Sequence, residues 1–309
     1  MVYNPGLSAD QSWLNLIEKI LRDGVEEFPR GKRTLEVIGC MSKLDMARPM
    51  VTVANRKLGY KFLAAEAWWI ASGSNRVDEI APYSKAISNF SDDGLTFRGA
   101  YGPKIQDQLP WVAEQLKNDV STRQAVLAIW RERPGPTKDY PCTLGAQWLI
   151  RTAQDGKAYL HCQVTMRSSD AWLGFPYDVF NFSIQSAFLI GYLRTAYPDV
   201  FDYPIHLGQL TFTAGSQHLY EEHFEAARNC TFESDPRFEY APLAPEMYQG
   251  NPYYFLKHVK SLADKKPAQS PFLVTDKFPV GYLSELYTLK LNEDKTGFDE
   301  LPNPRGIKK

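Results

Sequence analysis

The sequence has few of the features that mark a secreted, metal-binding or membrane protein. Its 309 residues include four cysteines and five histidines. No two cysteines form a Cys-x-x-Cys pair, and no cysteine–histidine spacing resembles a zinc site. The first residues lack the basic-then-apolar order of a signal peptide, and no apolar run approaches the roughly 20 residues of a membrane span. We therefore expect a reduced, cytoplasmic protein without a metal centre.

Charge of one sign is not in excess either. The chain carries 35 basic and 36 acidic residues, for a net charge of -1. This balance gives no reason to expect a nucleic-acid polymer or an anionic membrane as a partner, although a small anionic substrate needs only a few local arginines. Internal repeats and low-complexity linkers are also absent, and 44% of the residues are hydrophobic. The composition favours one soluble globular domain spanning residues 1–309.

Apolar patterns alternate irregularly between helical and extended spacing. Helices are predicted over residues 8–27, 59–72, 108–117 and 181–197, and strands over 35–40, 125–130, 147–150, 159–164 and 207–213. Residues 76–110 are polar and rich in loop signals, and residues 214–220 are expected to lead into a polar helix. Residues 231–309 are expected to be a C-terminal elaboration. The order predicts an α/β (α+β) fold with a mixed sheet packed by helices.

One cysteine stands in a position suited to chemistry. Cys142 follows Pro141, whose ring fixes φ and biases Tyr140 toward an extended conformation. Because the strand-like segment 147–150 follows, we expect the thiol where a loop enters a sheet. A cysteine in this context is more often a small buried apolar residue than a nucleophile, so its role depends on a second motif.

That second motif packs an arginine, serines, two acids, a glycine and a proline into the sixteen residues 166–181. Arg167 has the fork geometry that holds phosphate, and it could also lie beside a thiolate. Together with Pro141–Cys142 and the later His218-Leu-Tyr220, the run from Arg167 to Pro176 resembles the pattern of thymidylate synthases and their pyrimidine-hydroxymethylating relatives. The resemblance implies their mixed-sheet fold.

The resemblance covers about residues 10–230 and implies a folate-dependent enzyme acting on a pyrimidine nucleoside monophosphate. Cys142 would add to C6 of the base and so activate C5, with Arg167 favouring the thiolate. Glu66, an acid inside the apolar segment 59–72, would organise water and assist proton transfer, since such an acid is costly unless it is paired or working. The one-carbon donor would be 5,10-methylenetetrahydrofolate.

The same resemblance assigns the groups around the nucleotide. Arg167 and Ser168 would hold its phosphate together with an arginine of the basic loop 28–34, where Arg30 is the best match and Arg33 is an alternative. The residues that would hold the sugar 3′-hydroxyl are His218 and Tyr220. Without the resemblance, a solvated basic turn and a structural histidine would be the simpler explanations.

Further positions imply a partner subunit and the folate. The family places two arginines across a dimer interface; here Arg123 is kept and Gln124 takes the second place, where it could bond a sugar hydroxyl instead. We therefore expect a homodimer with shared active sites. On the folate side, Asp170 matches the acid that binds the pterin, Gly174 belongs to the same run, and Ile87 occupies the place of a large tryptophan.

Asp178 is the most informative departure from the thymidylate synthase pattern. The family's uracil enzymes carry asparagine there, whereas its cytosine-specific hydroxymethylases carry aspartate. A carboxylate accepts from cytosine N4, and a protonated one also serves N3, but facing uracil O4 it sets acceptor against acceptor. A helix-capping role would fit the position without explaining the exchange. Thr143 and Met166 likewise stand where the family has histidine and glutamine.

These departures favour a cytidylate 5-hydroxymethylase that acts on dCMP or CMP. Its covalent adduct would take up water rather than hydride, because the smaller Ile87 leaves room for a water molecule. One alternative is a folate-dependent methyltransferase on dCMP or dUMP, and another is a catalytically silent nucleotide- or RNA-binding homologue. Retention of Cys142, Glu66 and Arg167 argues against the silent homologue, since a binder needs no nucleophile.

Overall fold

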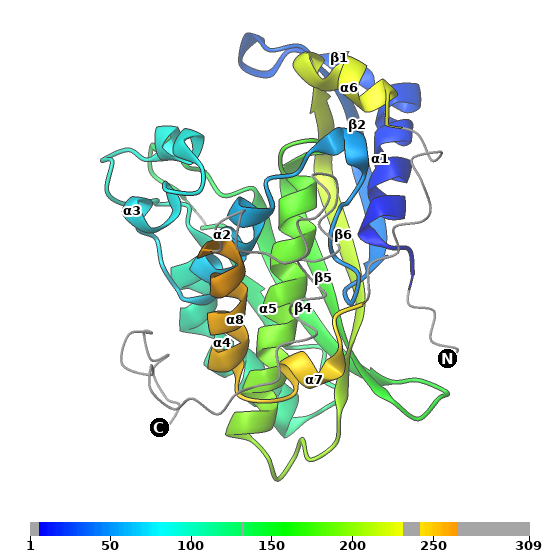
Figure 1. Ribbon diagram of the computed structural model, residues 1–309, viewed down its shortest axis with the longest axis vertical. Helices are drawn as coiled ribbons and strands as arrows, with labels where there is room; N and C mark the ends of the chain where they lie inside the picture. The colour runs from blue at the N-terminus through cyan, green and yellow to red at the C-terminus, as the bar shows by residue number, and fades with distance from the viewer. Residues whose placement is uncertain (1–5, 132, 231–241, 265–309) are drawn as a thin grey trace.

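A computed structural model describes residues 6–131, 133–230 and 242–264 (Figure 1). Its centre is a six-stranded mixed sheet in the order β1-β2-β6-β5-β4-β3. The strands are β1 (Val25–Glu27), β2 (Thr34–Asp45), β3 (Val126–Ala128), β4 (Thr143–Thr152), β5 (Ala158–Asp170) and β6 (Ile205–Tyr220). β5 and β6 pair in parallel, and every other neighbouring pair is antiparallel. The mixed α/β sheet expected from the sequence is confirmed.

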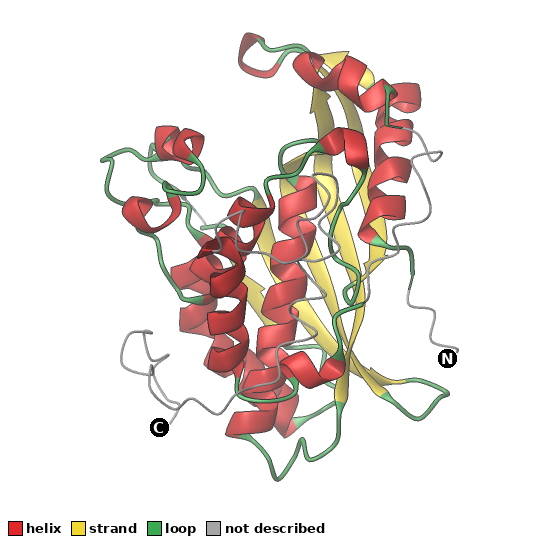
Figure 2. Cartoon of the chain, viewed as in Figure 1, coloured by secondary structure: helices red, strands yellow, loops and turns green. Residues whose placement is uncertain are grey.

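Helices pack around one long, buried helix that lies against the sheet (Figure 2). They are α1 (Ala9–Asp23), α2 (Tyr60–Ala71), α3 (Val77–Ile80), α4 (Tyr101–Asn118), α5 (Phe175–Ala196), α6 (Phe224–Arg228), α7 (Pro245–Tyr248) and α8 (Pro252–Asp264). α5 contacts β5 and β6 on one side and α2 and α8 on the other. Since it is enclosed on nearly every side, α5 is apolar all round rather than amphipathic.

The first helix shows how local sequence fixes an element and ties it to the site. Ser8 caps α1 and forms a reciprocal capping box with Gln11. The apolar face of the helix packs on β2. From that face, Trp13 donates its indole N–H to the carbonyl oxygen of Ala171 at 2.7 Å, and Ala171 lies just beyond β5. The helix therefore holds the turn that leads into α5.

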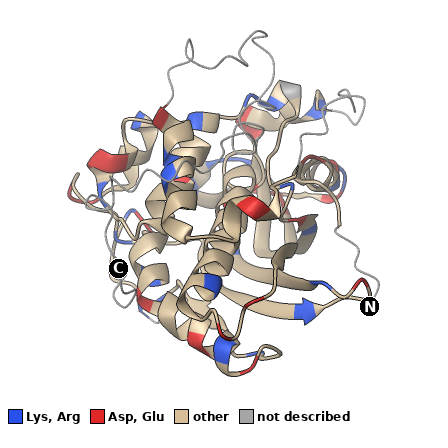
Figure 3. Ribbon diagram, turned by 60° about the horizontal axis from the view of Figure 1, so that its bottom comes forward, with Lys and Arg blue, Asp and Glu red and all other residues tan. Residues whose placement is uncertain are grey.

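The sheet also presents apolar side chains that no described helix covers. Ile38 and Met41 on β2 are 81% and 58% exposed, and Val126 on β3 and Leu144 on β4 are 44% and 37% exposed. Charged residues, in contrast, are scattered along the chain with both signs interspersed (Figure 3). None of the helices in the described ranges is long and apolar enough to cross a membrane.

Several predicted boundaries are wrong for identifiable reasons. α4 begins at Tyr101 rather than at 108, because Pro103 lies in its first turn, where the missing N–H costs nothing. Short helices also interrupt the polar stretch 76–110. Residues 214–220 continue β6 instead of leading into a helix, because this stretch pairs with both β2 and β5.

The predicted C-terminal elaboration is only partly described. Residues 231–241 and 265–309 lie outside the described residues. Between them, α7 and α8 pack against α5, and α8 also packs against α2.

Candidate active site

Cys142 lies directly before β4, where the sequence predicts a loop to enter the sheet. It is the one cysteine of the four that is not fully buried. Arg167 on β5 points its Nη2 at the sulfur, at 3.6 Å. Burial nevertheless raises the pKa of the Cys142 thiol above its usual value, and the charges of Arg167 and Arg30 offset this only in part. Burial therefore favours the neutral thiol over the thiolate in this structure.

Arg167 also fixes the segment that carries the cysteine. Its Nε donates to the carbonyl oxygen of Pro141 at 3.0 Å and its Nη2 to that of Tyr140 at 3.2 Å. The guanidinium lies 5.8 Å from the centre of the Trp130 ring. Its Nη1 makes no hydrogen bond within the described residues, so one edge of the fork is left for an anion.

The two departures beside these residues form a pair. Thr143 and Met166 are direct cross-strand partners on β4 and β5, and both are buried. The Thr143 hydroxyl donates to Sδ of Met166 at 2.9 Å, while its backbone N–H donates to the hydroxyl of Tyr101 at 3.2 Å. The residue pair that packs behind Cys142 is therefore buried, and neither of its side chains is titratable.

Two acids meet where α2 faces α5. Glu66 lies on α2, and Asp178 lies in the first turn of α5, with Gly174 as the cap residue; a capping role for Asp178 is excluded. Burial raises the pKa of Glu66 to about 7. Burial, and then the charges of Glu66 and Asp170, raise the pKa of Asp178 well above its usual value. Burial therefore disfavours the charged form of both carboxyls.

Asn181 joins these acids. It follows Asp178 by three residues on α5, which places both on one face of the helix. Its Nδ2 donates to Oε2 of Glu66 at 2.8 Å. Its Oδ1 is buried and has no partner within the described residues, so it is left to accept a hydrogen bond from a water or a substrate.

The ends of β5 and β6 bring the proposed sugar-binding residues together. His218 pairs with Asp170 across the parallel ladder, and its ring stands perpendicular to that of Tyr220, with centroids 5.2 Å apart. Burial lowers the pKa of His218, so its imidazole is neutral at pH 7. Ser168 lies on β5, two residues before Asp170, and is half-buried.

The two candidate arginines of the basic loop differ in their partners. Arg30 has a left-handed backbone, with φ of 56°, and its Nη2 donates to the hydroxyl of Tyr220 at 3.3 Å. Arg33 forms ion pairs with Glu26 and Glu221. Because Arg33 is neutralised in this way, Arg30 is the arginine of this loop that remains available to a phosphate.

The turn at the start of α5 is held by Asp170. Its Oδ1 accepts the backbone N–H groups of Trp172 and Leu173 at 2.8 and 2.9 Å, while Oδ2 has no hydrogen bond in the described part of the chain. A Cβ built on Gly174 would lie 3.1 Å from the carbonyl oxygen of Asp170 and 3.4 Å from Oδ2 of Asp178, so the backbone at 174 approaches both residues closely.

Three predicted residues come from other elements. Arg123 and Gln124 are exposed ahead of β3, and their side chains form no hydrogen bond or ion pair within the described ranges. Ile87 lies in a 3₁₀ turn at residues 85–90 and packs against the core, half-buried.

Sequence reasoning missed three contributors: Asn181, Tyr101 and Trp130. Tyr101 supports the segment next to Cys142, since its hydroxyl accepts the backbone N–H of Thr143. The spacing of Asn181 from Asp178 was the only sequence signal for its position. The stacking of Trp130 on Arg167 had none, since 37 residues separate them.

Comparison with known proteins identifies relatives for most of the chain. The family model for thymidylate synthase matches residues 11–241. A curated relative from Bacillus phage SP01, described as a deoxyuridylate hydroxymethyltransferase, is 30% identical over 199 residues. The aligned part covers 58% of this chain and 51% of that relative. The chain thus spans about half the length of the curated relative it matches.

Proposed function

The chain belongs to the thymidylate synthase family, and we propose that it is a cytidylate 5-hydroxymethylase. It would be a one-carbon transferase on dCMP or CMP that draws on 5,10-methylenetetrahydrofolate. The observation that carries the choice of base is the buried acid Asp178, held beside Glu66 where a uracil enzyme of the family would have an amide. The relative's hydroxymethyltransferase description supports the type of product.

Cys142 begins the reaction by adding to C6 of the pyrimidine, because C5 is too weak a nucleophile by itself. The thiol gives its proton to solvent, the S–C6 bond forms, and the C5=C6 electrons move onto C5 and the conjugated C4–N3 group of cytosine. Arg167, 3.6 Å from the sulfur, stabilises its negative charge on the way. Glu66 is suited to move protons in the later steps, since a pKa of about 7 makes both of its forms available at neutral pH.

Asp178 would pair with the base through both carboxyl oxygens. A neutral carboxyl donates its O–H to cytosine N3 and accepts from the N4 amino group, so both edges are satisfied. A neutral carboxyl can also pair with uracil in the reverse sense, and an ionised one sets an acceptor against N3 of cytosine or against O4 of uracil. The choice of cytosine therefore rests on the exchange of the family's asparagine for Asp178.

A second candidate follows from the neutral form of that carboxyl. Because burial disfavours the charged form of Asp178 and a neutral carboxyl can pair with uracil, a deoxyuridylate hydroxymethylase is compatible with the site, and the phage relative carries that description. The two candidates share the chemistry and differ only in the base. Methyl transfer, in contrast, would require water to be excluded from the site.

Water addition is supported by polar groups near Asp178. C5 would bond to the one-carbon unit of the folate; loss of the C5 proton and departure of tetrahydrofolate with the electrons of the broken C–N bond would then leave an exocyclic methylene at C5 of the base. Glu66 and the unpartnered Oδ1 of Asn181 offer two partners to one water molecule. The water oxygen bonds to the methylene carbon, its proton passes to Glu66, and the electrons return through the ring to release Cys142. No group is oxidised in this sequence.

The residues around Gly174 fit the folate. Oδ2 of Asp170, which has no hydrogen bond within the described residues, is left to accept from an aminopterin edge. Leu173 is 52% exposed at the same turn and offers apolar surface to a ring. These residues would bind and orient the co-substrate, with Ile87 as a further wall.

A homodimer would complete the phosphate site. Arg123 and Gln124 are exposed and have no side-chain partner in the described chain, so they are available to a neighbouring copy. The uncovered apolar side chains of the sheet, including Ile38 and Leu144, provide a surface through which two copies could associate.

Incubation with dCMP, CMP or dUMP and the folate tests the proposal directly. Products are identified by mass, and dihydrofolate is followed by its absorbance. We expect a hydroxymethylated cytosine nucleotide and no dihydrofolate. A methylated base with stoichiometric dihydrofolate would establish the methyltransferase instead. Absence of any product, and of a covalent Cys142 adduct with a 5-fluoropyrimidine nucleotide, would favour the silent homologue.

A further inference from the structure

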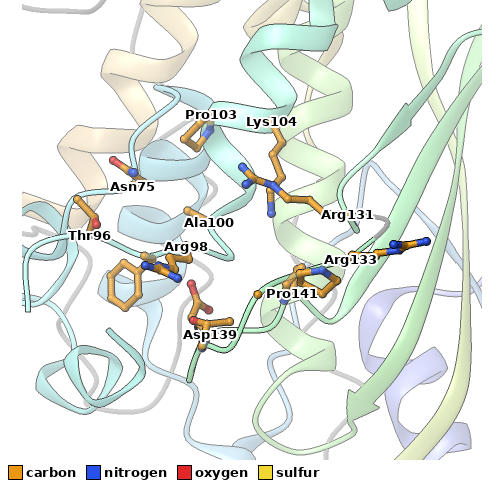
Figure 4. A pocket seen from close by; sticks show the side chains of 14 residues that line it. Asn75, Thr96, Arg98, Ala100, Pro103, Lys104, Arg131, Arg133, Asp139 and Pro141 are labelled. Carbon is orange, nitrogen blue, oxygen red and sulfur yellow. Dashed lines mark hydrogen bonds between the residues drawn. The ribbon is translucent and has the colours of Figure 1, made fainter. Parts of the chain in front are cut away.

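A cavity of about 330 Å³ lies next to the cysteine segment but outside the site described above (Figure 4). Its walls are the segment 96–100, the first turn of α4 and the loop that ends at Pro141. None of Cys142, Glu66 or Arg167 lines it. Nothing in the proposed reaction uses this cavity.

The lining is strongly cationic. Its charged side chains are four bases and one acid: Arg98, Lys104, Arg131, Arg133 and Asp139. The acid is already engaged, since Oδ2 of Asp139 accepts the backbone N–H of Gly99 at 2.6 Å. Arg98 lies 3.8 Å from Asp92, outside the cavity lining. Among the described residues, Asp139 is therefore the one carboxylate that shares the cavity with these bases, and its charge acts on Lys104.

Two of the bases face one another across the cavity. The side chains of Lys104 and Arg131 converge, while Arg133 extends away from them (Figure 4). Burial and the charge of Arg131 lower the pKa of Lys104. Arg131 forms no hydrogen bond or ion pair within the described residues. Two like charges held this way repel unless an anion lies between them.

The cavity is also rigidly built. Asp92 accepts the backbone N–H of Lys138 at 2.9 Å, which joins the two loops that form the walls. A Cβ on Gly99 would lie 2.3 Å from the carbonyl oxygen of Asp139, so only glycine permits their close approach. The volume lies at the lower end of small-molecule sites, and the pocket exists without a ligand.

We propose that this cavity is a second anion site, which binds the phosphoryl group of free phosphate or of a small phosphate ester between Lys104 and Arg131. The arginine fork matches phosphate oxygens and the lysine adds a point charge. A phosphoryl dianion balances both cations, whereas a single carboxylate balances one. Pro103 and Pro134 line the remaining space and suit a small organic body.

Occupation of this site restrains the catalytic thiol. Pro141 lines the cavity and Cys142 follows it directly. The charge of Asp139 already raises the pKa of the Cys142 thiol. A dianion bound in the same cavity acts in the same direction and lowers the thiolate fraction. The ligand is therefore an inhibitor of the thiol's reactivity.

Calorimetric titration with inorganic phosphate tests the binding. The wild type should show two classes of site, one at the nucleotide centre and one here. Arg131→Gln should raise Kd for the second class by roughly tenfold or more, since a hydrogen bond to a charged group is lost. Lys104→Gln should do the same. Arg22→Gln removes an equal charge from the exposed face of α1 and should leave both classes unchanged.

The comparison with Arg30→Gln separates this site from the nucleotide centre. Arg30→Gln should weaken phosphate binding only at the nucleotide centre. If this variant bound phosphate there as tightly as the wild type does, the result would count against the proposed function and not against the second anion site. Indistinguishable phosphate isotherms for the wild type and Arg131→Gln would overturn the second site. Glycerol 3-phosphate in place of phosphate identifies the source: tighter binding indicates an ester as ligand, equal or weaker binding the free ion.

Alkylation of Cys142 by iodoacetamide tests the link to the thiol, because the other three cysteines are buried. Phosphate should slow the alkylation of the wild type about threefold more than it slows the alkylation of Arg131→Gln. A threefold effect corresponds to a rise of about half a unit in the pKa of the Cys142 thiol. Equal slowing in both proteins would refute the inhibitory effect.

Discussion

Replacing Glu66 by glutamine should stabilise the fold while it abolishes turnover. The glutamine keeps the shape of the side chain and can still accept the hydrogen bond from Asn181. It removes a carboxyl whose pKa is raised by burial from 4.5 to about 7. The charged form of Glu66 is therefore disfavoured in the folded protein. At any pH where the carboxyl is ionised in the unfolded chain, this lowers the free energy of unfolding of the wild type.

The size and the pH window of the effect follow from these two pKa values. Below pH 4.5 the carboxyl is neutral in both states, so the variant and the wild type should be similarly stable. Between pH 4.5 and 7 the wild type loses stability progressively as pH rises, and above pH 7 the loss is constant. At about 1.4 kcal/mol per pKa unit, the variant should gain about 3 kcal/mol at pH 8. Loss of the Glu66 charge also lowers the pKa of Asp178, which adds to the gain.

Urea denaturation at pH 5, 6, 7 and 8 measures the difference in unfolding free energy. Glu114→Gln makes the same chemical change at an exposed position on α4 and serves as the control. We expect the difference for Glu66→Gln to grow with pH, and the difference for the control to stay near zero. A variant that is less stable than the wild type at pH 8, or a difference that does not vary with pH, would refute the assignment of Glu66 as a buried, strained acid.

Three further predictions concern the nucleotide site. Cys142→Ser should abolish turnover and leave nucleotide binding nearly unchanged, as measured by calorimetry, since phosphate and sugar contacts lie elsewhere; substantial residual turnover would exclude Cys142 as nucleophile. Asp178→Asn should shift the ratio of kcat/KM values from dCMP toward dUMP by at least about tenfold, and retained cytosine preference would show that another residue reads the base. Mixing Arg123→Ala with Cys142→Ser subunits should restore activity through heterodimers with one intact site; no recovery after verified subunit exchange would contradict a shared site.

The sequence predicts the class of fold because its apolar periodicity is strong where the core is. Its errors lie at positions where pairing or packing decides the outcome. Gly215 looks like the end of a strand, yet β6 runs through it, because neighbours on both sides supply hydrogen bonds. Pro103 looks like a helix breaker, yet it lies in the first turn of α4, where proline is tolerated.

The candidate site divides in a similar way. Motif order predicts that Cys142 and Arg167 come together, and they lie in contact across β4 and β5. The bond between Asn181 and Glu66 joins residues 115 positions apart, and local pattern carries no signal for it. The sequence also does not predict how deeply Cys142 is buried. The residue types indicate that Arg167 favours the thiolate, but burial of Cys142 raises the pKa of its thiol.

The buried pair of Thr143 and Met166 has a consequence for which substitutions this sequence tolerates. The hydroxyl and the thioether satisfy each other in a buried layer. An imidazole in place of Thr143 would have only the weak thioether acceptor as a partner there, and a glutamine in place of Met166 would bury an amide that lacks partners. Either replacement alone should therefore lower the stability of the fold. The two positions should accept substitution together more readily than one at a time.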